Sequence, residues 1–231
     1  MKSFRLALLT FLLVILCFVL SGSPRTNAEQ EKDKNVCFRW AFGAIVGAEN
    51  DLKLVAITRD TALKTGDQLK MFVELQKKCF VYVIYHSAQG EVSILFPYNV
   101  QQFTRDYETS KKYYIPQGDM WFRLDENVGR ETFYLLASSH RLMELEGLFE
   151  KYISADPVRK SKLVKQILAE IRKIKRRHRK FTAIAERPVP IVGNIRGVDD
   201  VQKAVRPDVS SIAAEISAKT FYSRTFTIDH Q

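Results

Sequence analysis

The fold of this chain is decided by residues 79–97, which read Cys79-Phe80-Val81-Tyr82-Val83-Ile84-Tyr85-His86-Ser87-Ala88-Gln89-Gly90-Glu91-Val92-Ser93-Ile94-Leu95-Phe96-Pro97. The first eight residues are almost continuously apolar and aromatic, which is typical of a central β-strand covered on both faces. The polar residues 87–90 then predict a turn into a second strand, which ends at Pro97 because proline has no backbone N–H to donate. The stretch therefore predicts a β-hairpin inside a sheet.

Shorter strand patterns lie on both sides of this hairpin. Apolar residues alternate along residues 38–46 and 69–75, and residues 120–124 and 131–138 predict two more strands. Short antiparallel strands at hairpin spacing favour a sandwich or a barrel. We therefore predict a β-sandwich-like domain at residues 36–139.

The periodicity changes after residue 139. Residues 140–187 carry apolar side chains at three- and four-residue spacing, which predicts two helices, and Asp156-Pro157 is a start signal for the second. Residues 188–231 form a mixed tail, and alternation at residues 222–228 predicts a strand that returns to a sheet. The expected fold class is mainly β with helices (α+β).

The first 28 residues have the pattern of a secretory signal peptide. Lys2 and Arg5 precede an apolar run at residues 6–20, and small residues follow up to Ala28. This run is shorter than the roughly 20 apolar residues of a membrane-spanning helix. We expect an exported protein, periplasmic or extracellular, with an uncleaved inner-membrane signal anchor as the alternative.

The positive charge is concentrated in one element. Residues 157–187 contain 12 lysines and arginines against two glutamates, in a chain of net charge +10. The densest cluster consists of Arg172, Lys173, Lys175, Arg176, Arg177, Arg179 and Lys180.

Several interpretations of this basic helix stay open. Its apolar face can dock on the β-domain while the basic face is only solvated. Alternatively the basic face contacts anionic lipid headgroups, giving peripheral membrane contact, or it binds an acidic envelope protein or another anionic cell-surface component. Nucleic acid is the least favoured partner, because an exported protein rarely meets it.

Residues 98–117 are predicted to form a long polar loop, and such loops are often functional. Its tyrosines, Tyr107, Tyr113 and Tyr114, are candidates for a binding surface, because tyrosine is enriched in interfaces. Alternatively they pack over one end of the sandwich.

Two cysteines follow the signal segment, Cys37 and Cys79. An even pair in an oxidising compartment is a disulfide candidate, although two small buried thiols would give the same pattern.

No catalytic, metal or cofactor site is predicted. The four histidines are scattered and no cysteine pair has zinc spacing. Cys79 and His86 lie on one predicted strand about 23 Å apart, which is too far for a nucleophile and its base.

Three motifs in order resemble a bacterial β-module of unknown function, which is found beside serine/threonine kinase and caspase-like domains and in standalone exported proteins. They are a Gly66-Asp67 turn, an aromatic strand at residues 79–84 and the hairpin into Leu95-Phe96-Pro97. Ile115-Pro116-Gln117-Gly118 and Gly129-Arg130-Glu131 have counterparts as well. The resemblance spans residues 38–138 and implies an immunoglobulin-like or related β fold with an accessory role.

Together these features predict a non-enzymatic interaction module of the bacterial cell envelope. The alternatives are a hydrolase with an unrecognised site at residues 98–117, and a structural subunit of an envelope assembly.

Overall fold

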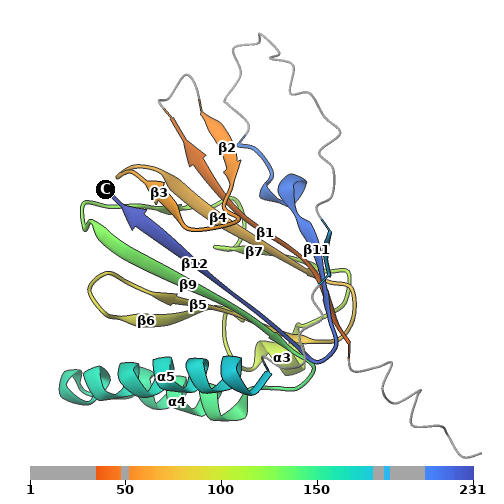
Figure 1. The fold of residues 1–231 in the computed structure, drawn as a ribbon, viewed down its shortest axis with the longest axis vertical. Coiled ribbons are helices and arrows are strands. Elements are labelled where there is room, and N and C mark those ends of the chain that lie inside the picture. The colour runs from red at the N-terminus through yellow and green to blue at the C-terminus, as the bar shows by residue number, and fades with distance from the viewer. Residues whose placement is uncertain (1–34, 48–51, 179–184, 188–205) are drawn as a thin grey trace, which may run out of the picture. The chain divides into compact units, whose positions relative to one another are not determined.

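The computed structural model describes residues 35–47, 52–178, 185–187 and 206–231. Two β-sheets face each other, and a layer of helices covers the outer side of the second sheet (Figure 1). This arrangement confirms the predicted fold class, mainly β with helices, as a sandwich that does not close into a barrel. The predicted signal segment, residues 1–28, lies outside the described residues.

The first sheet has seven strands, in the order β10-β11-β1-β4-β7 with β2 beside β1 and β8 beside β4. Their bounds are β1 Val36–Val46, β2 Lys53–Ala56, β4 Gln68–Leu75, β7 Lys112–Ile115, β8 Phe122–Arg123, β10 Ala185–Arg187 and β11 Ala214–Ala218. All of its pairings are antiparallel.

The second sheet has five strands, in the order β3-β12-β9-β5-β6. Their bounds are β3 Thr61–Leu63, β5 Phe80–His86, β6 Val92–Phe96, β9 Gly129–Ser138 and β12 Phe221–His230. β3 runs parallel to β12, and the other pairings are antiparallel.

The predicted hairpin forms β5 and β6, and its near-continuous apolar character has two causes. Val81 and Val83 point into the core between the sheets, while Tyr82 and Ile84 point to the opposite side, against the helices. Since successive side chains of a strand alternate between its faces, β5 needs apolar residues at every position.

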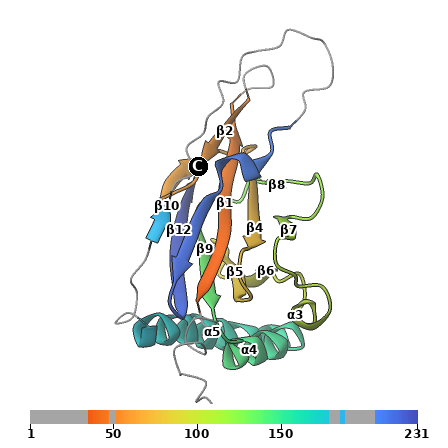
Figure 2. The same ribbon diagram turned by 90° about the vertical axis from the view of Figure 1, so that its right-hand side faces the viewer.

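The helical layer consists of α4 (Met143–Ile153) and α5 (Pro157–His178), which lie side by side beneath the second sheet (Figure 2). A polar contact joins this layer to the sheet. The buried Tyr82 hydroxyl donates to the Glu146 carboxylate at 2.6 Å and accepts the Leu142 N–H at 2.9 Å. Among the described residues, no helix is long and apolar enough to cross a bilayer.

The C-terminal tail supplies strands to both sheets. β11 pairs with β1, and β12 lies between β3 and β9 in the second sheet. A short 3-10 helix at Val209–Ile212 packs on β1 where Gly43 leaves room: a Cβ there would lie 2.9 Å from the Val209 side chain. The tail thus completes the domain that residues 36–139 begin.

The long loop expected at residues 98–117 is more ordered than predicted. It contains the short helix α3 (Gln102–Arg105) and strand β7, which pairs with β4. Each of these elements has only four residues, which is too short to produce a clear periodicity in the sequence.

Candidate functional site

The basic helix α5 begins where the sequence predicts. The Asp156 carboxylate accepts the N–H of Arg159 at 3.0 Å, and Pro157 takes the first helical position. Three isoleucines, Ile167, Ile171 and Ile174, are buried against the second sheet and α4. Fully burying such a side chain contributes about 1.5–3 kcal/mol, so the apolar side of α5 is firmly docked and its basic side faces outward.

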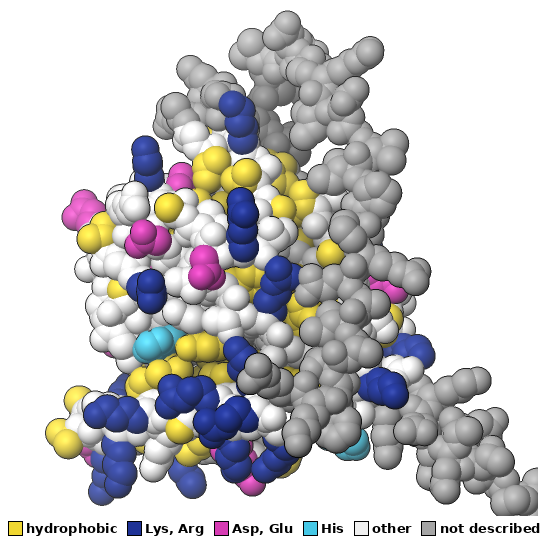
Figure 3. All heavy atoms as spheres, in the orientation of Figure 1, with side chains coloured by type: hydrophobic (Ala, Val, Ile, Leu, Met, Phe, Trp, Pro, Cys, Tyr) yellow, Lys and Arg dark blue, Asp and Glu magenta, His cyan; other side chains and the backbone are white. Residues whose placement is uncertain are grey.

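Four exposed basic residues form one row along α5, which we call the basic row: Lys162, Lys165, Arg172 and Arg176. Their spacing of three, four or seven residues places them on one side of the helix. Val158, 85% exposed, extends the same row toward the N-terminus. Lysine and arginine side chains gather over this helical layer in Figure 3.

The basic row has no acidic partner within the described residues. Among the lysines and arginines of α5, those that form ion pairs in this part of the chain are Arg159 and Lys173. Lys173 binds Glu144 of α4 at 2.8 Å and Glu170 at 3.1 Å, and the hydrogen bond to Glu144 is the main cause that raises the pKa of its ammonium group. Lys173 therefore joins the two helices, while the row beside it stays available.

The remaining members of the predicted basic cluster differ in their exposure. Lys175 is half-buried and donates to the Thr225 hydroxyl at 2.8 Å, and burial lowers the pKa of its ammonium group. Arg177 is exposed. Arg179 and Lys180 lie outside the described residues.

The structure does not present Tyr107 and Tyr113 as a binding surface. The Tyr107 hydroxyl accepts the Val81 N–H at 2.8 Å, and burial raises the pKa of that hydroxyl. Tyr113 is 3% exposed, and its hydroxyl accepts the Glu108 N–H at 2.8 Å. Both rings fill the end of the core, which is the packing alternative considered for them above.

Tyr114 covers a buried lysine that sequence reasoning missed. The Lys70 ammonium lies 5.5 Å from the ring centres of both Tyr114 and Trp121. It donates to the carbonyls of Gly118 at 2.5 Å and Met120 at 2.7 Å, and burial lowers its pKa. These contacts hold residues 118–120 on the outer face of the first sheet, a structural role.

The candidate disulfide is not formed in this structure, where Cys37 and Cys79 are both free thiols, the alternative considered for this pair. The Cys79 side chain is buried between the sheets, whereas Cys37 falls between Val36 and Phe38, whose side chains point into that core. Alternation along β1 therefore turns Cys37 to the opposite face. The Cys79 sulfur contacts the backbone carbonyl of Cys37 at 4.0 Å instead.

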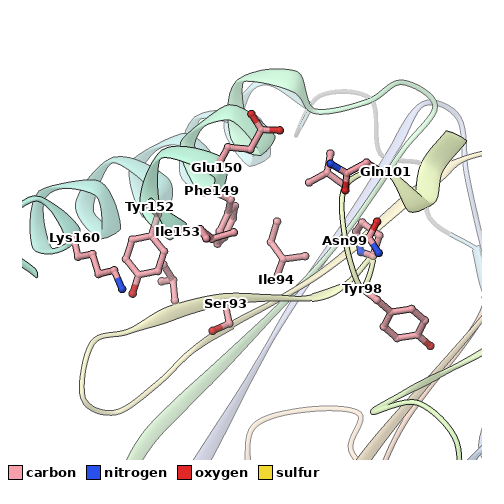
Figure 4. Close-up of a pocket in the computed structure, with 13 residues that line it drawn as sticks. Ser93, Ile94, Tyr98, Asn99, Gln101, Phe149, Glu150, Tyr152, Ile153 and Lys160 are labelled. Atoms are coloured by element: carbon pink, nitrogen blue, oxygen red, sulfur yellow. The ribbon is translucent and has the colours of Figure 1, made fainter. Parts of the chain in front are cut away.

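An apolar groove lies where the helical layer leaves the edge of the second sheet uncovered (Figure 4). It has a volume of about 500 Å³, and its walls include Ile94 of β6 with Phe149, Tyr152 and Ile153 of α4. The Lys160 ammonium, 5.4 Å from the Tyr152 ring centre, closes the end near the turn between the helices.

A polar recess of about 380 Å³ lies beside this groove, along the loop after β6. Tyr98, Asn99 and Gln101 line both spaces. The recess is also lined by Gln102, Arg105, Asp106 and Gln117.

Gln102 is the unusual member of this set. It is 6% exposed, and its carbonyl Oε1 accepts the Tyr98 N–H at 2.8 Å. Its Nε2 is buried without a hydrogen-bond partner, which is rare because an unpaired buried donor costs free energy. No sequence signal distinguishes Gln102, because glutamine in a polar loop is ordinary.

Two other buried polar atoms without partners lie at the opposite end of the sandwich, Glu131 Oε2 and His230 Nδ1. His230 Nε2 lies 3.1 Å from the Thr65 hydroxyl, which donates its own proton to the Asp125 carbonyl at 2.9 Å. In the described part of the chain, no three His, Cys, Asp or Glu side chains are grouped for a metal ion.

Comparisons with known proteins agree with the resemblance at the level of an uncharacterised domain. No curated protein and no solved structure matches the chain. A family match covers about a third of the chain and runs from β3 through β9, so it includes β6 and the loop that forms the polar recess but excludes α5. Residues 62–141 match the domain of unknown function DUF4384.

Proposed function

We propose that this protein is an exported, non-enzymatic interaction module of the bacterial cell envelope, and that the basic row of α5 lies against an anionic membrane surface. The observation that carries the proposal is the row itself: four exposed basic side chains, on one side of a helix whose other side is docked. The signal-like pattern of residues 1–28 supports export.

A lipid surface suits this row better than an acidic protein does. The basic side chains follow a straight helix, which matches a flat layer of headgroups, and each basic residue near such a surface contributes about 1 kcal/mol. Val158 lies in the same row and is largely exposed, so it can enter the interfacial region while the row binds headgroups. An acidic envelope protein or polymer is the competing outcome.

Vesicle binding tests the proposal. The purified protein is sedimented with vesicles of phosphatidylcholine containing 30% phosphatidylglycerol, beside a variant with Lys162→Glu, Lys165→Glu, Arg172→Glu and Arg176→Glu. Loss of four contacts of about 1 kcal/mol each predicts binding weaker by about three orders of magnitude. Binding of the native protein should also fall as salt is raised.

The matched control reverses four exposed basic residues elsewhere, Lys64, Lys77, Lys78 and Arg123. It has the same net charge as the first variant and should bind almost like the native protein. Equal binding by both variants would contradict a role for the row. If no vesicle binds but an envelope protein is retained only by the native row, the partner is that protein rather than lipid.

The hydrolase alternative at residues 98–117 stays a prediction. The side chains of the recess there are mostly amides, and the Asp106 carboxylate is paired with Lys111. This set suits hydrogen bonding to a ligand better than nucleophilic attack.

A further inference from the structure

We propose that the apolar groove and the polar recess together bind an extended peptide segment, which lies along the edge of β6. This site is separate from the basic row, since of the α5 residues only Lys160 lines the groove. The inference does not depend on the membrane contact proposed above.

The two spaces lie next to each other, since Tyr98, Asn99 and Gln101 line both, and a ligand that crosses these three residues follows one path through both spaces. One end is apolar, with walls from Ile94 and Phe149, and the other end is dominated by amide side chains. A ligand that follows this path needs apolar groups at one end and hydrogen-bonding groups at the other.

Gln102 defines which groups the polar end needs. Its Oε1 is already bonded to the Tyr98 N–H, so the orientation of the amide is set and Nε2 points its donors elsewhere. That nitrogen is buried without a hydrogen-bond partner, and Gln102 belongs to the lining of the recess. A ligand carbonyl oxygen that settles there would give the amide the acceptor it lacks.

The neighbouring amides fit a peptide backbone. Asn99, Gln101 and Gln117 each carry one acceptor and two donors, which match the alternating C=O and N–H groups of an extended chain. Arg105 adds further donors at the far end of the recess.

β6 supplies the second half of the recognition. It is the last strand of its sheet, and among the described strands none pairs with its outer edge. Ser93 and Ile94 of this strand line the groove. A free strand edge offers backbone donors and acceptors to another extended segment, and a flanking pocket then selects its side chains.

A peptide explains the apolar end better than a sugar does. Ile153 is 76% exposed and, with Ile94 and Phe149, offers an aliphatic and aromatic pocket for an apolar side chain. A saccharide would satisfy the amides but would leave both this pocket and the strand edge without complementary groups.

Phage display of random linear dodecapeptides on the purified protein provides the probe, and a synthetic copy of the enriched sequence is then titrated by fluorescence anisotropy. We expect enriched sequences with an apolar anchor. Gln102→Glu keeps the acceptor for the Tyr98 N–H but removes the donor, so it should weaken binding about tenfold or more. Ile153→Asp should weaken binding to a similar degree by placing a charge in the apolar pocket.

Matched controls carry the same changes at exposed sites outside the groove: Gln89→Glu in the turn before β6 and Val128→Asp in the turn before β9. Both should bind like the native protein. Since Gln102 is buried, Gln101→Ala at the exposed wall gives a second measure if Gln102→Glu fails to fold.

Amide hydrogen exchange locates the peptide, and we expect slower exchange along β6. Failure to enrich any sequence, or an enriched peptide that binds the Gln101, Gln102 and Ile153 variants equally, would overturn the proposal. Binding of N-acetylglucosamine oligomers at the recess, with no peptide enriched, would assign the site to saccharides instead. Each of these outcomes is independent of whether the basic-row variant binds vesicles, so the two proposals can fail separately.

Discussion

The basic row of α5 and the groove beside β6 are built in opposite ways. The row consists of exposed side chains from one helix, and none of them belongs to the core. The groove takes its walls from a strand, a loop and a helix, and Phe149 serves both as a wall and as a core residue. The comparison shows that one surface can change without cost to the fold, whereas the other is part of the fold.

The family match separates the same two regions. Residues 62–141 contain β6 and the whole polar recess, while α4 and α5 lie beyond them. The groove is therefore formed between the matched segment and a helix outside it. Each experiment below tests how far this contrast holds.

The largest effect is expected when the matched segment is separated from the rest. A fragment of residues 62–141 lacks β1 and β12, which pair with β4 and β9. Its two sheets then have long unpaired edges, so we expect it to be unfolded or aggregated. Circular dichroism and proton NMR would show this against the intact protein, and a well-dispersed spectrum of the fragment would contradict it.

The second effect compares one residue from each surface. Phe149→Ala should lower the free energy of unfolding by about 3–5 kcal/mol, because the 2%-exposed ring leaves a cavity under the second sheet. Arg172→Ala should change it by no more than about 0.5 kcal/mol, since the side chain is exposed. Urea unfolding measures both values. Similar losses in the two variants would remove the contrast between the surfaces.

A smaller effect concerns the contact that positions α4 as a wall of the groove. Tyr82→Phe removes the hydroxyl that bonds the Glu146 carboxylate and the Leu142 N–H. Because these buried groups then lack a hydrogen-bond partner, the free energy of unfolding should fall by about 1–3 kcal/mol. Relative to the native protein, amide hydrogen exchange in the variant should become faster in α4 while it stays unchanged in the first sheet. An equal increase in both regions would argue against a local role.

A pH-dependent effect tests the core that both surfaces share. Burial raises the pKa of the Cys79 thiol from 9.0 to about 12, so the unfolded chain loses this proton at a lower pH than the folded one. The thiol therefore contributes its stability below pH 9, and that stability is lost progressively between pH 9 and 12. In Cys79→Ala, the free energy of unfolding measured with urea should fall less steeply between pH 9 and 12 than in the native protein. An equally steep fall in both proteins would contradict the assignment.

Thiol labelling supplies a check on the same residue. Cys79 should react only on unfolding, whereas Cys37, which is partly exposed, should react in the native protein. A protein with no reactive thiol after unfolding without reductant would show that the two cysteines are bridged.

The sequence predicts features that depend on one element and misses those that depend on several. The hairpin of β5 and β6 and the amphipathic helix α5 follow from periodicity within a single segment. The position of β12 beside β9 depends on contacts across more than 80 residues, so no local pattern reveals it. The same holds for the groove, whose walls come from residues 92–101, 149–153 and 160.

Single-element patterns also leave alternatives open. The sequence could not decide whether Tyr107 and Tyr113 form a surface or pack over the core, because nothing local shows that the loop folds back. It could not decide whether the two cysteines are bridged either, because the strand pattern does not show how the faces of the two strands meet. Gln102 became a candidate only when its burial was known.

The place of β12 has a consequence for the time course of synthesis. β9 ends at Ser138 and its partner β12 starts at Phe221, so roughly 80 residues must still be made after β9 has been synthesised. At about 5–20 residues per second this interval lasts roughly 4–16 s. During that time the backbone edge of β9 that later pairs with β12 has no neighbour, so the second sheet cannot be completed until the C-terminal strand has been made.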